Sequence, residues 1–68
     1  MTINYNKLWK MLIDRNMTKT ELRKKAKFST VTLAKMGKNQ HVGTEVLVKI
    51  CNVLNCGIDD IVEIKKSN

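Results

Sequence analysis

The chain has 68 residues, no proline, only three glycines and a hydrophobic fraction of 43%, a composition that fits one small helical domain over residues 1–68 better than a turn-rich β fold. Its formal net charge of +7 is uneven, with ten basic against two acidic residues up to position 41 and three against four from position 42 onward. A basic N-terminal part beside a near-neutral C-terminal part indicates a polyanionic partner on one face.

Apolar residues recur at helical spacing along most of the chain, which predicts an all-α fold of five short helices. In chain order the expected helices span Tyr5–Arg15, Thr18–Ala26, Thr30–Gly37, Glu45–Leu54 and Ile58–Val62. The stretch "TKTE" at the second start is a capping box of Thr18 with Glu21. Ser29 and Thr44 are expected to cap the third and fourth helices.

Asparagine follows the first and fourth expected helices at Asn16 and Asn55, and asparagine tolerates the left-handed conformation that commonly ends a helix. Past the last expected helix, the tail "VEIKK" alternates apolar and polar residues. Such alternation suits a short strand, which could pair with "TIN" near the N-terminus. The sequence therefore allows short terminal strands beside the helices.

Only "KFS" joins the second and third expected helices, the short connection of a helix-turn-helix, whose second helix can lie in the DNA major groove. With this unit and the ending "LVKICNVLNCGIDDIV", the chain resembles the Cro/C1-type (XRE-like) helix-turn-helix family, in particular its small single-domain members, over about Leu8 to Val62. The resemblance implies a lambda-repressor-like DNA-binding domain. The family's inward-facing positions fall on five apolar residues, Leu22, Ala26, Phe28, Leu33 and Met36.

Four positions depart from the family pattern. The family often has a small residue where Arg23 stands and glycine where Lys27 stands, and a lysine held left-handed there carries strain of roughly 1 kcal/mol. Many members pair a buried arginine in the first helix with a glutamate at the end of the third, and Leu12 and Gly37 occupy those positions here. Because both partners are absent together, no unpaired buried charge is expected.

The resemblance also implies which residues contact DNA. Base edges would be reached from the third helix by Thr30, Val31, Thr32 and Lys35, with Thr32 contacting either a base or a phosphate. Phosphates would be contacted by Lys19, Ser29, Lys38, Asn39, Gln40, His41 and Thr44. The N-termini of the second and fourth helices would assist. Threonine and valine methyls can pack on thymine and lysine can donate to guanine, so the residue types fit this role.

Several of these features also have a plainer interpretation. The run of Lys24, Lys25 and Lys27 could be only a solvated helix face, and Val31 could be a core residue. An exposed β-branched residue on a recognition helix needs a partner. Val31 is therefore stronger evidence for a binding surface than the lysine run is. Trp9 lies off the main apolar stripe of its helix, where it would cover a core edge or contribute to a subunit contact.

No constellation for catalysis, metal binding or cofactor binding is apparent in the sequence. His41, Cys51 and Cys56 match no zinc-ligand spacing, and the two cysteines are better explained as core residues. Asp59 and Asp60 are better explained as helix-start residues, which the helix dipole favours, than as an acid/base pair. We therefore expect a non-enzymatic protein with no cofactor, no metal and no evident small-molecule effector.

Together these features predict a sequence-specific transcriptional regulator that binds double-stranded DNA, and the resemblance favours a repressor that occludes a promoter. Family members commonly bind palindromic operators as dimers, with half-sites about one DNA turn apart. The candidates for an exposed homodimer contact are Ile61, Val62 and Ile64. No stretch has the ~18 apolar residues of a membrane span, and the N-terminus lacks a signal-peptide core. A cytoplasmic location with reduced cysteines is therefore expected.

Three alternatives remain open. An antitoxin would use the same fold to bind a toxin protein and to regulate its own gene, although the sequence shows no separate toxin-neutralising extension. A cationic membrane-surface protein would carry bulky apolar residues opposite the lysines of the second helix, where the apolar positions are few. Nonspecific binding of RNA or DNA would use the same positive charge without reading bases.

Overall fold

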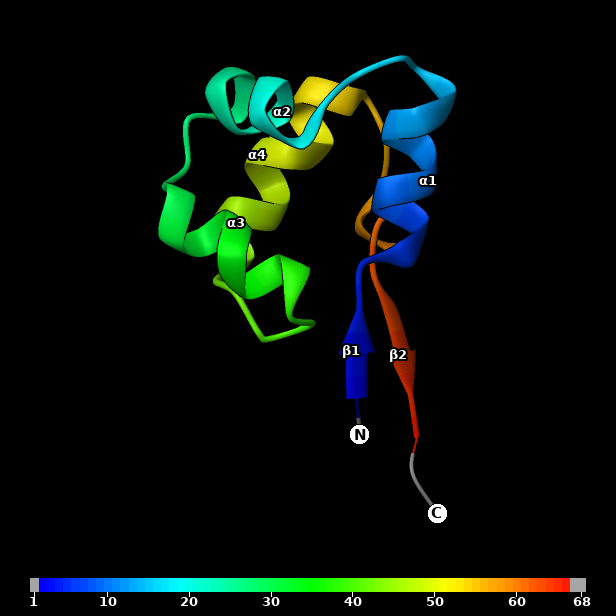
Figure 1. Ribbon diagram of the computed structural model, residues 1–68. Helices are drawn as coiled ribbons and strands as arrows, with labels where there is room; N and C mark the ends of the chain where they lie inside the picture. Colours follow the sequence, from blue (N-terminus) through cyan, green and yellow to red (C-terminus); the bar gives the residue numbers. More distant parts are fainter. Residues whose placement is uncertain (1, 67–68) are drawn as a thin grey trace.

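The computed structural model describes residues 2–66, and within that range it contains four α-helices, one short 3-10 helix and two short strands. In chain order these elements are β1 (Thr2–Asn4), α1 (Asn6–Asp14), α2 (Lys19–Ala26), α3 (Thr30–Gly37), α4 (Thr44–Leu54), the 3-10 helix η1 (Ile58–Asp60) and β2 (Glu63–Lys65). The two strands form a ribbon that extends beyond the N-terminal end of α1 (Figure 1). The mainly helical architecture is confirmed.

The expected fifth helix over Ile58–Val62 is wrong, because the helical segment ends at Asp60 and is a 3-10 turn. The amide of Asp60 donates to the carbonyl of Gly57 at 3.1 Å, and the amide of Ile61 donates to the carbonyl of Ile58 at 3.0 Å. The Asp60 carboxylate accepts from the Gly57 amide at 3.0 Å, which closes the turn. The chain is extended again from residue 63 to form β2, so the turn stays short, as 3-10 segments usually are.

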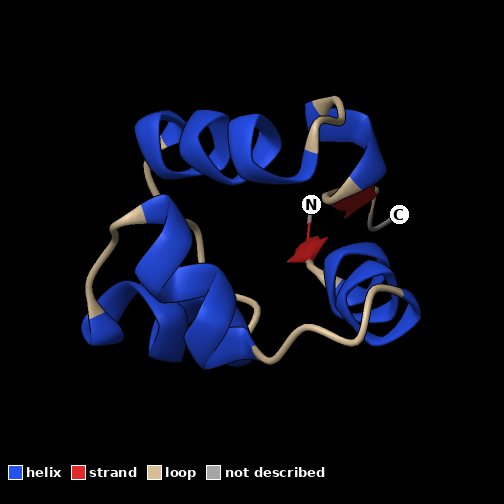
Figure 2. Cartoon of the chain, turned by 90° about the horizontal axis from the view of Figure 1, so that it is seen from above, coloured by secondary structure: helices blue, strands red, loops and turns tan. Residues whose placement is uncertain are grey.

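Apolar side chains from α1, α2, α3, α4 and the turn after η1 meet in one core cluster. Its most deeply buried members, each 2% exposed or less, are Tyr5, Leu8, Leu12, Leu22, Met36, Ile50, Leu54 and Ile61. Ala26, Phe28 and Leu47 complete the cluster. The strongest helix–helix packing joins α2 to α4, and α3 packs on α2. The α4 helix therefore packs against the α2–α3 unit mainly through α2 (Figure 2).

The inward-facing positions of the expected helix-turn-helix meet this core. Leu22, Ala26, Phe28 and Met36 are buried, and Leu33 packs partly buried against the cluster. Leu12, at the position where the family often has an arginine, is only 2% exposed. Among residues 2–66 no polar or charged side chain is buried, which agrees with the joint absence of both partners of the family's ion pair.

Two helix ends were predicted correctly and one helix start was not. Asn16 and Asn55 both have φ of 54°, in the left-handed region. Thr44 was expected to cap α4, but it is the first helical residue and Gly43 occupies the cap position without a side-chain bond. The Gly43 carbonyl accepts from the amide of Val46 at 3.0 Å. The helix therefore begins one residue earlier than the threonine hydroxyl suggested.

The two terminal strands pair, as the alternation in the tail allowed. β1 and β2 are antiparallel, and Ile3 lies directly opposite Ile64. The three residues expected at an exposed dimer contact have different environments. Ile61 is fully buried, which contradicts its place on that surface, because its side chain completes the core next to η1. Val62 is partly buried, and Ile64 is 62% exposed.

Candidate nucleic-acid interface

The start of α3 is fixed by Ser29, as its sequence position indicated. The Ser29 Oγ accepts from the amide of Thr32 at 3.1 Å, and the hydroxyls of the two residues lie 3.0 Å apart. Ser29 itself is extended, with φ of −77° and ψ of 159°, the usual geometry of a capping residue. The bond from the Thr32 amide to Ser29 caps the first turn of α3. The two hydroxyls also form a hydrogen bond with each other.

The outer face of α3 presents three of the four expected base-reading side chains. Thr30 and Lys35 are exposed, and Val31 is 65% exposed, so the interpretation of Val31 as a core residue is wrong. Val31 and Lys35 are four residues apart and therefore lie on one helix face. Thr32 is half-buried and turned toward the cap. The structure thus exposes Thr30, Val31 and Lys35 on α3, with Val31 and Lys35 on one helix face, and leaves Thr32 half-buried beside the cap.

The turn between α2 and α3 is held by backbone and side-chain bonds. Lys27 is left-handed, with φ of 57° and ψ of 52°, and its amide donates to the carbonyl of Arg23. The amide of Phe28 donates to the same carbonyl at 3.3 Å. The Arg23 guanidinium donates to the carbonyl of Phe28 at 3.4 Å, while the Phe28 ring is buried in the core. Arg23 therefore clamps the turn that sets the angle of α3.

The segment from Lys38 to His41 contributes four of the expected phosphate contacts, and all four side chains are exposed. Asn39 has φ of 56°, which turns the chain sharply after α3. The amide of Gln40 donates to the carbonyl of Lys35 at 2.9 Å, and the Gln40 carbonyl accepts from the phenol of Tyr5 at 2.7 Å. The loop is thus tied both to the end of α3 and to the start of α1.

Burial raises the pKa of the Tyr5 phenol, so the phenol stays protonated and remains a donor to the loop at neutral pH. His41 lies further along the loop, beside the ribbon, where it lines a small hollow of about 140 Å³ with Thr2, Ile3 and Ile64. The Tyr5 bond therefore ties the loop to the start of α1, and His41 lies near the ribbon across this hollow.

The N-terminus of α2 carries the expected capping box. The Thr18 hydroxyl accepts from the Glu21 amide at 3.1 Å, and the Glu21 carboxylate accepts from the Thr18 amide at 3.2 Å. Lys19, an expected phosphate contact, places its ammonium 4.2 Å from the centroid of the Trp9 ring. Such a cation–π contact holds the lysine in place while its charge stays at the surface.

The N-terminus of α4 completes the set of expected phosphate contacts. Thr44 is exposed, and no side chain caps this helix, so its first amides are free of side-chain acceptors among residues 2–66. Glu45 in the same turn is acidic and would oppose an approaching phosphate. The chemistry of this helix start is therefore mixed, with a favourable dipole beside an unfavourable carboxylate.

The family model of the Cro/C1-type helix-turn-helix DNA-binding domain matches residues 7–67. The chain belongs to this family. Among solved structures, the crystal structure of transcriptional regulator VanUg, Form II, is similar to this chain, with 53% sequence identity and a TM-score of 0.89 over 91% of this chain and 83% of that one. Comparison with the curated proteins gives no match.

Three residues hold parts of the candidate interface of this Cro/C1-type domain in place, although sequence reasoning did not assign them to it. They are Tyr5, which holds the loop after α3, Trp9, which holds Lys19, and Arg23, which clamps the turn. The rings of Tyr5 and Trp9 pack at 6.4 Å between centroids. Their spacing of four residues was a signal that they share a helix face, but it did not show what that face would contact.

The remaining reactive groups of this Cro/C1-type domain lie outside the α2–α3 unit. Cys51 and Cys56 are both free and partly buried against the core. Burial, and after it the neighbouring Cys56, raises the pKa of the Cys51 thiol, which disfavours the reactive thiolate. Within the described part of the chain, no three metal-ligating side chains come together, and no helix is long and apolar enough to cross a membrane.

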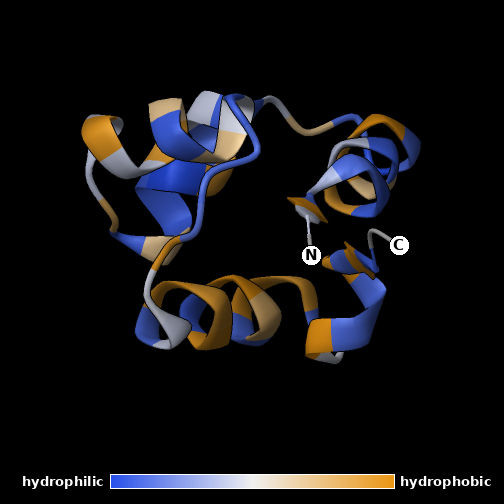
Figure 3. Cartoon of the chain, turned by 90° about the horizontal axis from the view of Figure 1, so that it is seen from below, coloured by the Kyte–Doolittle hydropathy of each residue, from blue (hydrophilic) through white to orange (hydrophobic). Residues whose placement is uncertain are grey.

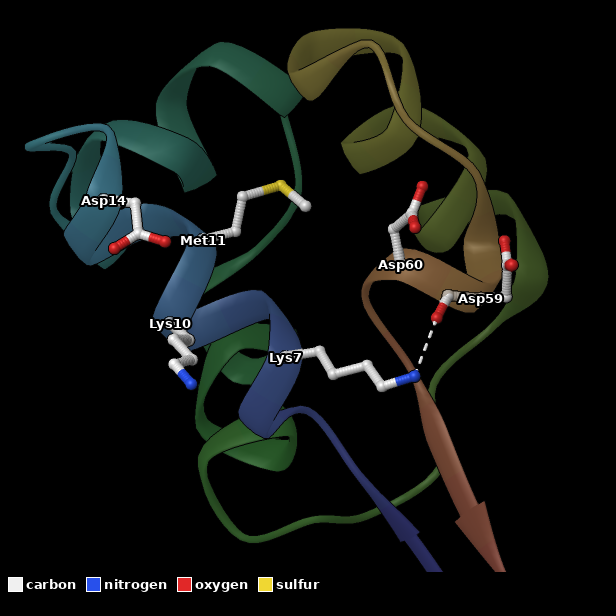
Figure 4. A pocket seen from close by; sticks show the side chains of 6 residues that line it. All are labelled: Lys7, Lys10, Met11, Asp14, Asp59 and Asp60. Atoms are coloured by element: carbon white, nitrogen blue, oxygen red, sulfur yellow. Dashed lines mark hydrogen bonds between the residues drawn. The ribbon is translucent and has the colours of Figure 1, made fainter.

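A wider hollow of about 370 Å³ lies between α1 and η1. It is lined by Lys7, Lys10, Met11, Asp14, Asp59 and Asp60. Figure 4 shows side chains of both charges around it, with the Lys7 ammonium donating to the Asp59 carbonyl at 3.3 Å. Two lysines stand against three aspartates around this hollow, so its lining has no excess of positive charge to attract a polyanion, and the hollow is not part of the candidate interface.

Proposed function

We propose that this chain is a sequence-specific transcriptional regulator of the cytoplasm, and that residues 1–68 act as one DNA-binding unit. It binds a palindromic operator as a dimer and represses by occluding the promoter. The family membership supports double-stranded DNA as the ligand, and the similar solved structure is described as a transcriptional regulator. Repression, the palindromic operator and the dimer go beyond what these two comparisons support, and they are part of the proposal.

The exposed face of α3 carries this proposal. Val31 is 65% exposed on a helix that is otherwise anchored by Met36, which is fully buried. An aliphatic side chain held at the surface of a rigid helix favours a partner with apolar groups, such as the thymine methyl in the major groove. Thr30 and Lys35 flank it with a hydroxyl and an ammonium, which can bond base edges.

The expected phosphate contacts surround this face and would set the register of α3 on the duplex. They come from three places, namely Lys19 and Ser29 on the helix-turn-helix, the loop Lys38–His41, and Thr44 at the start of α4. Phosphate contacts supply affinity that falls with salt but carry no sequence information. Discrimination then rests on the base-reading set of Thr30, Val31, Thr32 and Lys35, at roughly 1–3 kcal/mol for a good contact.

The test is selection of bound sequences from a pool of random duplex DNA, first with the wild-type chain. We expect one enriched motif with two inverted half-sites. Selection is then repeated with Thr30→Ala and with Lys35→Ala, each of which should relax the base preference at a different position of the half-site. Lys10→Ala, on α1 and apart from α3 (Figure 1), removes an exposed lysine without touching the base-reading face and should leave the motif unchanged.

Two outcomes would count against the proposal in different ways. If the wild-type chain enriches no motif at moderate salt, the proposal of a sequence-specific regulator fails. If a motif appears but is the same with Thr30→Ala and Lys35→Ala, the protein reads DNA through residues other than those proposed here.

A further inference from the structure

The two cysteines of the chain meet where α4 ends. Cys51 lies in the last turn of α4, and Cys56 is the second residue after that helix. Between them Asn55 is left-handed, with φ and ψ both at 54°. The Cys56 amide donates to the Cys51 carbonyl at 3.1 Å, which is the bond that closes a Schellman motif at a helix end. The turn therefore brings Cys56 back beside Cys51.

This helix end holds the two cysteines close enough for a disulfide with little movement of the backbone. The 3.1 Å bond limits the distance between the two Cα atoms to about 7 Å or less, given ordinary backbone dimensions. Disulfides span Cα atoms that are roughly 4.4–6.8 Å apart. In a Schellman motif the side chains of these two positions are frequently in contact. Here both thiols are free, and both side chains pack partly buried against the core.

The two thiols also differ in their readiness to react. Burial first and the neighbouring Cys56 next raise the pKa of the Cys51 thiol, with smaller effects from Asp60 and Asp59. Since the thiolate is the attacking form in disulfide chemistry, Cys51 is a poor first nucleophile at neutral pH. We therefore expect Cys56 to react first and Cys51 to complete the bond.

We propose that Cys51 and Cys56 are a modification site, at which a low-molecular-weight disulfide such as oxidised glutathione reversibly forms an intramolecular disulfide. Cys56 gives up its proton, and its thiolate attacks one sulfur of the small disulfide, which forms a mixed disulfide and releases one thiolate. Cys51 then gives up its proton and attacks the Cys56 sulfur, which releases the second thiolate. The chain thus loses two electrons and two protons, and the small disulfide gains both to become two thiols.

The bond would fasten the end of α4 to the segment that leads into η1. The α4 helix is mostly apolar (Figure 3) and packs on both α2 and η1. Its other end, at Thr44, follows the loop after α3 and lies about 15 Å away along the helix axis. We therefore expect oxidation to stabilise the domain and to leave the exposed face of α3 unchanged, so this inference does not depend on the proposed function.

Disulfides in the cytosol are usually transient or redox-sensing, so a pair of this kind would be reduced in ordinary conditions and would close under oxidising stress. The site therefore adds a response to oxidants that reading DNA does not require.

The test equilibrates the full chain with oxidised and reduced glutathione at fixed ratios, blocks the remaining thiols and measures mass. Trypsin should leave both cysteines in one peptide of residues 50–65, because no lysine or arginine lies between Lys49 and Lys65. In the oxidised wild type this peptide should lack two hydrogens and take up no blocking reagent. The equilibrium constant for the bond should be roughly ten-fold or more larger in the folded chain than in urea, because the fold holds the thiols together.

The coupling between the bond and the fold is reciprocal. The oxidised wild type should therefore unfold at a higher urea concentration than the reduced form, and a reducing agent should reverse the gain. Cys51→Ser and Cys56→Ser are the matched controls. Each should form at most a mixed disulfide with glutathione, and glutathione should not raise the stability of either. Cys51→Ser, which keeps the first nucleophile, should form its mixed disulfide faster than Cys56→Ser.

The proposal is overturned if the folded wild type carries only glutathione adducts or links between two chains. It is also overturned if the equilibrium constant is no larger in the folded chain than in urea. A mixed disulfide that forms faster on Cys56→Ser than on Cys51→Ser would overturn the proposed order of attack. DNA selection with the oxidised chain should return the motif of the reduced chain, and a different motif would show that the bond reaches α3, against this inference.

Discussion

Lys27 shows how one residue of the helix-turn-helix departs from its family without changing the fold. Its backbone is left-handed, with φ of 57°, where glycine costs little and other residues are strained by roughly 1–2 kcal/mol. The surroundings hold it there, because the Lys27 amide is bonded to Arg23 and the Phe28 ring is anchored in the core. The side chain is exposed and so adds positive charge beside the candidate interface at the expense of stability.

Lys27→Gly should therefore raise the free energy of unfolding. Relief of the strain favours the folded state by roughly 1 kcal/mol, and the greater freedom of glycine in the unfolded chain offsets part of this gain. We expect a net increase of about 0.5 kcal/mol, measured by urea unfolding followed by circular dichroism. Lys27→Ala is the matched control, since it removes the same charge but keeps the strain. Equal stability of the two variants would show that the turn is not strained at this position.

At the scale of the elements, the helix starts show which features the sequence could predict. The starts of α2 and α3 followed from Thr18 and Ser29, because a cap depends only on residues three or four positions away. The fifth helix could not be predicted correctly, because the length of η1 depends on the pairing of β2 with β1 at the other end of the chain. The start of α4 was also predicted incorrectly. The Thr44 hydroxyl suits a cap, but Gly43 occupies the cap position in an extended conformation.

The two capped helices allow a matched experiment. Ser29→Ala and Thr18→Ala should each lower the free energy of unfolding by about 1 kcal/mol, measured by urea unfolding. Only Ser29 fixes the start of α3, so Ser29→Ala should also lower the affinity for the selected DNA motif by about five-fold, whereas Thr18→Ala should change affinity little. Binding is measured by fluorescence anisotropy well below the unfolding midpoint. Equal losses of affinity in both variants would mean that stability, rather than the orientation of α3, governs binding.

At the scale of the whole molecule, the contacts that the sequence did not predict are those between different elements of the fold. The bond from the Tyr5 phenol to Gln40 joins residues 35 positions apart, and no local pattern points to it. The cation–π contact of Lys19 with Trp9 likewise depends on how α1 packs beside α2. By contrast, the exposed positions of α3 follow from helical periodicity once the buried residues are known. The exposed face of α3 was thus predictable, and the residues that hold α3 in place were not.

The uneven charge of the molecule leads to a prediction about salt. If Lys38 contacts a phosphate, Lys38→Gln should reduce the steepness of the plot of log binding constant against log salt by about 1, because one fewer counterion is released. Lys10→Gln lowers the net charge by the same amount, but Lys10 lies on α1 at the rim of the mixed-charge hollow. Its slope should stay that of the wild type, with at most a uniform loss of affinity from the weaker long-range potential. Equal slopes in the two variants would show that total charge, and not the loop after α3, determines how this chain holds the DNA backbone.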